Sequence, residues 1–300
     1  MSWLLLAFSG PVLWGVSFHL DKYLVERYFK TTEVAVLLVF TAWIGLLMLP
    51  FILYFAPGVL SLGARPIAIV ALSGALLMTA MLFYLRALQT EEAAIVAPLF
   101  QASPIFAYGL GYLVLGEVLT ARQLLGGGAI ILGALILSYR GHGGTLKARL
   151  VVLMLCCTLI LAVASVIFKL FAIRDAFWPT TFWTYAGEAL FGFAILAKPA
   201  YRRQFGALLR TNRGALIAVN GANELINLGG GLGTRYALTL APLSLVQAIG
   251  STTSLFVFLF GVLLALFLPK LGRMTLSPGN LLRQGLGAVL ITAGVTLVSG

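Results

Sequence analysis

Apolar residues form long runs along this chain, and charged residues, glycine or proline interrupt the runs at intervals. A helix of about 20 mostly apolar residues crosses a hydrocarbon layer of roughly 30 Å. Ten runs of this kind cover residues 3–22, 34–56, 66–88, 93–115, 123–139, 149–171, 178–197, 214–235, 242–268 and 283–299. The pattern predicts an all-α integral membrane protein with ten transmembrane helices. The clearest separations are the charged stretches 26–30, 140–149 and 198–213.

Composition supports the same class. Hydrophobic residues are 61% of the 300 positions and charged residues 10%, against roughly 25% charged in an ordinary soluble domain. One soluble core of this size has no room for that much apolar surface. The first run lacks the basic start and small-residue cleavage site of a signal peptide, so we expect it to remain as a span. Cys156 and Cys157 are neighbours on one helix, which argues against a disulfide or a metal site.

The charge of the loops predicts orientation and partners. The net charge is +11, and the basic residues lie in short loops between apolar runs, where they anchor to lipid head groups rather than to nucleic acid. Loops after the odd-numbered segments hold 15 Lys and Arg, and the others hold 4. By the positive-inside rule the odd-numbered loops are cytoplasmic and both termini lie outside. The expected location is a cell membrane of the bacterial inner-membrane type.

The chain also repeats itself. A lysine comes near the end of segments one and six, Lys22 and Lys169, and segments five and ten each carry two glycines seven residues apart, at 126 and 133 and at 287 and 294. The repeat predicts two five-helix halves, residues 1–140 and 149–300. Five is odd, so the second half enters the membrane inverted. Inverted repeats around a central cavity are a recurring plan of secondary transporters.

Segments three to five carry motifs that resemble a known family. They read Tyr84-Leu-Arg-Ala-Leu, Ala-Pro98-Leu-Phe-Gln-Ala-Ser-Pro104-Ile-Phe, Leu-Gly116-Glu117-Val-Leu-Thr120-Ala-Arg-Gln123-Leu-Leu-Gly126 and then Gly133. The chain resembles the EamA-type drug/metabolite transporters. The second half repeats the pattern more weakly and has Leu266-Phe267 in place of Gly116-Glu117. The resemblance implies ten spans in two repeats. It leaves the substrate open among amino acids, other metabolites, nucleotide sugars and drug-like compounds.

The strongest polar cluster lies in segment eight. Asn220, Asn223, Glu224 and Asn227 follow the spacing i, i+3, i+4, i+7 and so share one helix face. Polar groups at membrane depth are functional candidates when they face a cavity, and amides that hold helices together are the alternative. The following glycines, Gly229, Gly230 and Gly231, weaken the helix and suit a gate, although close helix packing explains them almost as well.

Single ionisable residues give further candidates. Glu188 lies in the middle of segment seven, where it either exchanges protons or forms a fixed ion pair with Lys169. Lys169 either faces the cavity, where it attracts a carboxylate or phosphate, or extends to the head groups. His19 is more often a packing residue than a proton relay. Glu117 and Arg122 are expected to form a salt bridge in a loop.

Other side chains complete the expected substrate site. The aromatic candidates are Trp14, Tyr84, Trp183 and Tyr185, which suit an amphipathic substrate but also an interfacial belt or packing. Gln101 and Gln247 are amides within spans. Pro98 is expected to distort its helix and to contribute to gating.

These features favour a secondary transporter of a small organic metabolite, an amino acid or similar, that works by alternating access. Export is the expected direction, and protons are one possible coupling ion. The chain lacks a Gly-Lys-Ser/Thr phosphate-binding loop, so no nucleotide cofactor is expected. A flippase for a lipid or lipid-linked sugar is the alternative. An intramembrane enzyme is disfavoured, since no His-Glu-x-x-His or Gly-x-Ser-x-Gly motif occurs. The assembly is expected to be a monomer or a homodimer.

Overall fold

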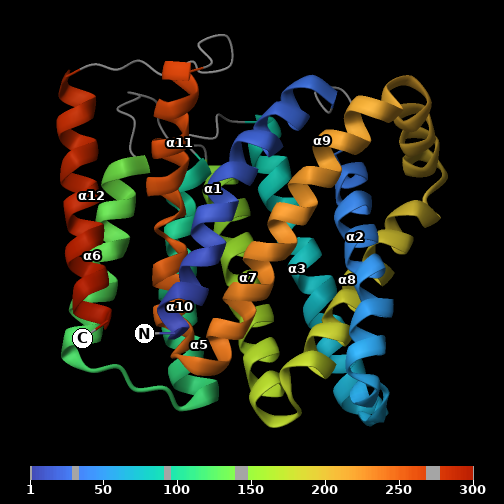
Figure 1. The fold of residues 1–300 in the computed structure, drawn as a ribbon, viewed down its shortest axis with the longest axis horizontal. Coiled ribbons are helices and arrows are strands. Elements are labelled where there is room, and N and C mark those ends of the chain that lie inside the picture. Colours follow the sequence, from blue (N-terminus) through green and yellow to red (C-terminus); the bar gives the residue numbers. More distant parts are fainter. Residues whose placement is uncertain (1, 29–33, 91–95, 139–147, 268–277, 300) are drawn as a thin grey trace.

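The computed structural model describes residues 2–28, 34–90, 96–138, 148–267 and 278–299. Every element in these ranges is a helix (Figure 1). Their bounds are α1 Ser2–Tyr28, η1 Val34–Val36, α2 Leu37–Phe55, η2 Pro57–Ser61, α3 Ala64–Thr90, η3 Ala97–Ala102, α5 Ser103–Leu115, α6 Ala121–Ser138, α7 Ala148–Arg174, α8 Phe177–Ala197, α9 Pro199–Leu240, α10 Leu243–Gly250, α11 Thr253–Phe267 and α12 Pro278–Ser299.

Several of these helices have the length and composition of membrane spans. Five stretches of the described residues qualify as candidates: Trp3–Tyr28, Val34–Phe55, Ala64–Gln89, Ala148–Arg174 and Leu243–Leu264. Shorter apolar helices cover Leu99–Leu115, Ala121–Leu137 and Leu282–Val298. The all-helical class and its membrane character are confirmed. The number of ten spans stays a prediction.

One expected boundary is wrong, and one expected segment is not a continuous helix. The charged stretch 198–213 is not a loop, because α9 begins at Pro199 and continues unbroken to Leu240. Proline suits a helix start, where its missing N–H is not needed, so the basic residues fill the first turns of α9. The run 242–268 is divided into α10 and α11 at Ser251 and Thr252.

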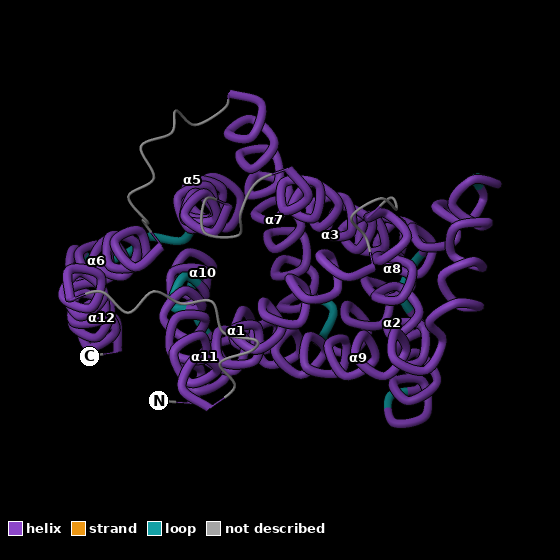
Figure 2. Tube along the Cα trace, turned by 90° about the horizontal axis from the view of Figure 1, so that it is seen from above, coloured by secondary structure: helices purple, strands orange, loops and turns teal. Residues whose placement is uncertain are grey.

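The helices lie in two rows when the molecule is viewed from above (Figure 2). One row holds α5, α7 and α3, and the other holds α10, α11, α1 and α9. The pair α6 and α12 stands at one edge, and α2 and α8 stand near the other. Within this arrangement α1 packs on α9, α3 on α7, α2 on α8, α5 on α10 and α6 on α12. Helices from the first and second parts of the sequence are therefore interleaved around one interior.

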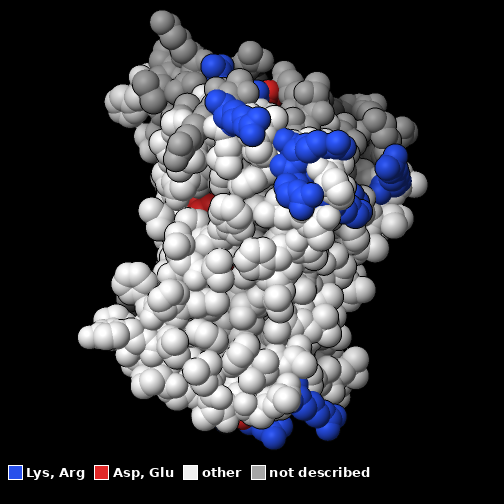
Figure 3. All heavy atoms as spheres, turned by 90° about the vertical axis from the view of Figure 1, so that its right-hand side faces the viewer, with Lys and Arg blue, Asp and Glu red and all other residues white. Residues whose placement is uncertain are grey.

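The two ends of the bundle differ from its middle. Figure 3 shows Lys and Arg gathered near both ends of one face, with an almost uncharged band between them. The first turn of α1 and the last turn of α12 lie at the same end (Figure 1). The opposite end carries the start of α9, where Lys198, Arg202 and Arg203 are exposed. This distribution of charge suits a protein surrounded by lipid at mid-height.

Candidate functional site

A cavity of about 1520 Å³ runs between the two rows of helices. Its lining covers Trp14 to Glu26 of α1 and Ser73 to Gln89 of α3, but only Ser103 and Pro104 of α5. Since α1 and α3 end where α5 begins, the lining reaches that end of the bundle, where its residues Lys22 and Glu26 are exposed. At the other end its lining stops at Phe168 and Leu238, where the two side chains belong to a compact apolar cluster. The cavity therefore has one open and one closed end.

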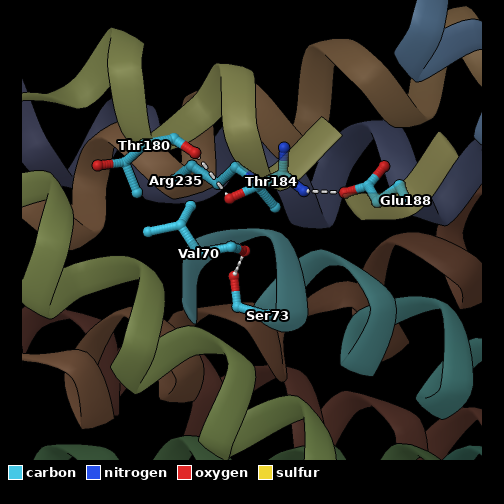
Figure 4. Close-up of polar contacts among 6 residues, drawn as sticks. All are labelled: Val70, Ser73, Thr180, Thr184, Glu188 and Arg235. Carbon is cyan, nitrogen blue, oxygen red and sulfur yellow. Dashed lines mark hydrogen bonds and ion pairs between the residues drawn. The ribbon is translucent and has the colours of Figure 1, made fainter. Parts of the chain in front are cut away.

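An ion pair lies near the closed end. Arg235 Nη2 of α9 donates to Glu188 Oε1 of α8 at 2.6 Å, and both residues line the cavity. Figure 4 shows the two side chains directed toward one another, with Thr184 one turn from Glu188 on the same helix. The guanidinium also stands over the rings of Tyr185 and Phe168, 4.7 and 5.7 Å from their centroids. A cation over an aromatic face is attracted by the ring quadrupole, so three groups hold Arg235 in place.

Small residues on α3 and α8 place Glu188 beside the cavity. A Cβ on Gly187 would collide with the carbonyl oxygen of Ala71, and a Cβ on Gly74 would collide with that of Thr184. The two backbones therefore touch, which brings the buried face of α8 close to α3. Burying an ion pair is costly unless its geometry is good, and removing one partner leaves an uncompensated charge. The pair is therefore a feature that the fold must actively support.

Arg235 retains unused donor capacity. Its Nη1 has no hydrogen-bond partner among the residues that the structure describes. A guanidinium carries five N–H donors, and a buried donor without an acceptor costs about 1–3 kcal/mol. The side chain is 13% exposed, so part of it is open to the cavity.

A second carboxylate lies on the same face of α9. Glu224 lines the cavity, and its Oε1 accepts from the Thr41 hydroxyl of α2 at 2.6 Å. Asn227 forms a further side-chain hydrogen bond with it. No Lys or Arg of the described ranges forms an ion pair with Glu224. A carboxylate without a cation at this depth is a candidate to bind a positively charged group.

The four polar residues expected to share one face of segment eight have different surroundings. Glu224 and Asn227 line the cavity, whereas Asn220 and Asn223 do not. Asn223 Nδ2 donates to Asp21 Oδ1 of α1 at 2.7 Å, so this amide holds α9 against α1. Asn220 is buried, and neither of its amide atoms has a partner within the described part of the chain. The cavity interpretation fits two of the four residues, and the alternative of interhelical amides fits Asn223.

Most of the other expected site residues line the cavity: Trp14, His19, Tyr84, Gln101, Tyr185 and Gln247. The His19 ring hydrogen bonds the Val257 carbonyl at 3.0 Å, and Gln247 donates to Ser165 at 3.1 Å. The Tyr84 hydroxyl and Gln101 Oε1 have no partner among the described residues. Trp183 lies elsewhere and donates to the Val59 carbonyl at 2.9 Å.

The expected partners of Lys169 and Glu188 need correction. Lys169 does not pair with Glu188 but with Glu117, at 2.6 Å, and it also donates to the Ala241 carbonyl. Glu117 in turn accepts from the Leu243 backbone N–H at 2.8 Å, so its ion pair is with Lys169 and not with Arg122. These groups lie beyond the closed end of the cavity, outside its lining. Lys169 therefore links α7 to the α5–α6 connection.

Backbone geometry explains how Glu117 reaches these partners. Gly116 ends α5 in the left-handed region, with φ of 66°, and the Glu117 N–H returns to the Gly111 carbonyl. Glycine adopts this conformation without steric cost. A Cβ on Gly111 would stand 2.9 Å from Glu117 Oε2, so the absence of a side chain there also makes room. The Gly-Glu pair folds the connection back across α5 and onto α10.

The expected gating residues lie in helices. Gly229, Gly230 and Gly231 are all within the continuous α9, and a Cβ on Gly230 would come within 3.2 Å of Gly10 in α1. Close packing on α1 accounts for Gly230, whereas Gly231 lines the cavity with open space beside it. Pro98 lies in the 3₁₀ helix η3, which agrees with a distorted segment. Gating by these residues stays a prediction.

Sequence reasoning missed Arg235. Arg235 is the last residue of the expected segment 214–235, and the count of basic residues in the loops includes it. The available signal was Glu188, a carboxylate in the middle of an apolar helix that needs a partner. The sequence suggests Lys169 as this partner, because Lys169 lies inside a span. Arg235 is the last residue of its expected segment, whereas α9 continues for five more residues.

A bundle of apolar helices around an internal cavity that also contains buried charged residues defines a membrane protein. The model of the EamA-like transporter family matches residues 1–139. This part of the chain is similar to the EamA-like transporters of the drug/metabolite transporter superfamily, and it is the part that carries the motifs. No curated protein matches the chain. A solved structure described only as "Crystal structure of protein" is similar, with a TM-score of 0.66 and 16% identity over 100% of this chain and 98% of the other. At that identity the likeness concerns the fold alone.

Proposed function

We propose that this protein is a secondary transporter that exports a small organic metabolite, an amino acid or similar, by alternating access. The observation that carries the proposal is the cavity with one open end, one closed end and a buried ion pair near the closed end. Its volume exceeds the roughly 300–1,000 Å³ of ordinary ligand pockets, so a metabolite and its water fit inside.

The packing of the helices supports two inverted halves, residues 1–140 and 149–300. When each helix is replaced by its counterpart in the other half, the packed pair α1–α9 becomes the packed pair α7–α3. The pairs α2–α8, α5–α10 and α6–α12 each consist of two counterparts, so they are unchanged. An internal twofold axis in the membrane plane has this effect. Such a protein reaches a state open at the opposite end when the two halves adopt each other's arrangement.

Charge supports the direction. The open end is the one at which α1 and α3 end, and it is also the end that carries the basic start of α9. If this end is cytoplasmic, as the positive-inside rule suggests, the structure is ready to accept a substrate from the cell. Protons are the proposed coupling ion, because Glu188 and Glu224 are carboxylates at membrane depth that line the route.

Counterflow in proteoliposomes tests the function. Vesicles are loaded with an unlabelled mixture of amino acids, polyamines and organic acids, and uptake of each labelled compound is measured. We expect at least one compound to accumulate transiently in vesicles with the wild-type protein. Vesicles with Glu188→Gln/Arg235→Gln, which removes both charges of the ion pair together, should not accumulate it. Equal fluxes in the two preparations would contradict the proposal.

One observation favours a lipid-like substrate as the second candidate. A smaller pocket of about 350 Å³ lies between α1 and α11, lined by apolar residues and His19. His19, Leu20 and Leu264 line this pocket and the main cavity alike, and an acyl chain would enter the cavity sideways at this point. A fluorescent lipid analogue that exchanges leaflets only in vesicles with the protein would favour the flippase.

A further inference from the structure

We infer that the transported metabolite carries an acidic group and a basic group several bonds apart, as in an ω-amino carboxylate or an amino acid with a basic side chain. The acid binds at Arg235 and the base binds at Glu224. This inference rests on the proposed function, since it names the substrate of the same cavity.

The acid end is defined by the unused donors of Arg235. Its Nη2 is held by Glu188, while Nη1 has no acceptor among the described residues. A planar guanidinium binds a carboxylate through two parallel N–H bonds. The rings of Tyr185 and Phe168 fix its plane. Because Nη1 is buried, an entering acid reaches it only when the terminal group turns toward the cavity.

The base end is defined by Glu224. Its carboxylate is oriented by Thr41 and Asn227, two neutral donors that leave its charge uncompensated. A carboxylate accepts up to about four hydrogen bonds, so an ammonium group still finds acceptor positions. Glu188 is less suitable, because its charge is already balanced by Arg235.

Glu224 and Arg235 are spaced widely along α9, which favours a ligand whose two charged groups are also separated. Glu224 and Arg235 are eleven residues apart on one continuous helix, a rise of about 16 Å between their Cα atoms. Thr41, which binds Glu224, and Gly45, which lies beside Glu188, are one turn apart on α2, about 6 Å. Glu188, the partner of Arg235, therefore lies about one helical turn of α2 away from Glu224. An amino nitrogen and its own carboxylate carbon are only about 2.5 Å apart.

The wall between the two ends suits an apolar spacer. Eleven residues turn an α-helix through slightly more than three full turns, so Glu224, Leu228, Gly231 and Arg235 form one stripe. All four line the cavity. Leu228 offers an apolar contact, and a Cβ on Gly231 would meet nothing within 4 Å. A methylene chain is therefore expected to lie over Gly231.

Binding of a matched ligand series to the purified protein tests this. The probes are 6-aminohexanoate, which has both charges and the spacer, hexanoate and hexylamine, which lack one charge each, and glycine, which lacks the spacer. We expect 6-aminohexanoate to bind at least tenfold more tightly than the other three. In Glu188→Gln/Arg235→Gln the preference over hexylamine should disappear, and in Glu224→Gln the preference over hexanoate should disappear.

A pair of glycine variants tests the spacer. Gly231→Leu fills the cavity wall and should weaken 6-aminohexanoate at least tenfold. Gly221→Leu is the control, because Gly221 also has open space beside it but does not line the cavity; it should bind as the wild type does. Thermal unfolding of both variants shows whether either has lost its fold.

Two outcomes separate this inference from the proposed function. Transport of glycine or of a neutral amino acid with no binding of 6-aminohexanoate would overturn the inference and leave the transporter standing. Counterflow of none of the mixed compounds would remove the proposed function itself. Binding of hexylamine or hexanoate as tight as that of 6-aminohexanoate would also overturn the inference.

Discussion

Gly126 of α6 and Gly294 of α12 meet backbone to backbone. A Cβ on Gly126 would stand 2.8 Å from the Gly294 carbonyl oxygen, and a Cβ on Gly294 would stand 2.6 Å from that of Gly126. Gly133 and Gly287 repeat the relationship two turns away, at 2.6 and 2.8 Å. The order of the contacts shows that the two helices are antiparallel. Small residues allow this approach, which maximises van der Waals contact between helices in lipid.

We predict that Gly126→Ala destabilises the protein, because the added methyl group forces α6 and α12 apart. Overpacking of this kind typically costs about 1–3 kcal/mol, and a lower midpoint of thermal unfolding in detergent would measure it. Gly128→Ala is the control. Its Cβ meets nothing within 4 Å, and alanine favours a helix over glycine by up to about 1 kcal/mol. A midpoint that falls equally in both variants would contradict the packing argument.

The Arg235–Glu188 ion pair predicts a non-additive pair of variants. Arg235→Gln alone leaves Glu188 charged and buried, a change that typically costs about 3–5 kcal/mol. Adding Glu188→Gln should recover most of that loss, since no uncompensated charge remains. Thermal unfolding of the two single variants and the double variant measures the coupling. Strictly additive shifts would mean that the two side chains do not act as a pair.

The Glu117–Lys169 ion pair predicts a change at the closed end. Glu117→Gln removes the charge that holds Lys169, so the closed end should open more readily. A cysteine at Phe168, the last lining position of α7, should then react faster with a water-soluble maleimide added from the side of the closed end. Arg122→Gln is the control: Arg122 is exposed and unconnected to this pair, so its labelling rate should stay unchanged. Unaltered labelling in Glu117→Gln would show that the pair does not hold this end shut.

Asn220 and Asn223 should respond differently to the same substitution. Neither amide atom of Asn220 has a partner among the described residues, so Asn220→Leu should be neutral or stabilising. Asn223→Leu removes the donor to Asp21, and a buried group left without its partner costs about 1–3 kcal/mol. Thermal unfolding in one detergent compares the two. Greater damage from Asn220→Leu would show that this amide has a role the contacts do not reveal.

Part of the site could be read from the sequence, and the reason is chemical. Ionisable and amide side chains are costly in an apolar helix wherever they lie, so Glu188, Glu224, Gln101 and Gln247 stood out before any fold was known. All four line the cavity. Asn220 and Asn223 stood out equally but do not line the cavity, and Asn223 binds Asp21 of α1 instead. Helical spacing defines a shared stripe and not the neighbour that covers each of its edges.

The pairing of charges could not be read in the same way. Lys169 lies inside the expected segment 149–171, and it is therefore the partner that the sequence suggests for Glu188. In the structure the partner of Glu188 is Arg235, which lies five residues before the end of α9. Partners of this kind come from different helices, and their distance depends on how the helices cross. Sequence separation carries no such information.

The sequence by itself determined that this protein is a bundle of membrane helices, because apolar runs of span length have no stable place in water. It also indicated a likeness to the EamA-like transporters, through local motifs such as Gly116-Glu117. Only the tertiary structure decided that the interior holds a cavity closed at one end, which buried polar groups face it, and that Arg235 is among them. Those properties arise from contacts between helices, such as that of Gly74 with Thr184. Such contacts form only when the whole bundle has assembled.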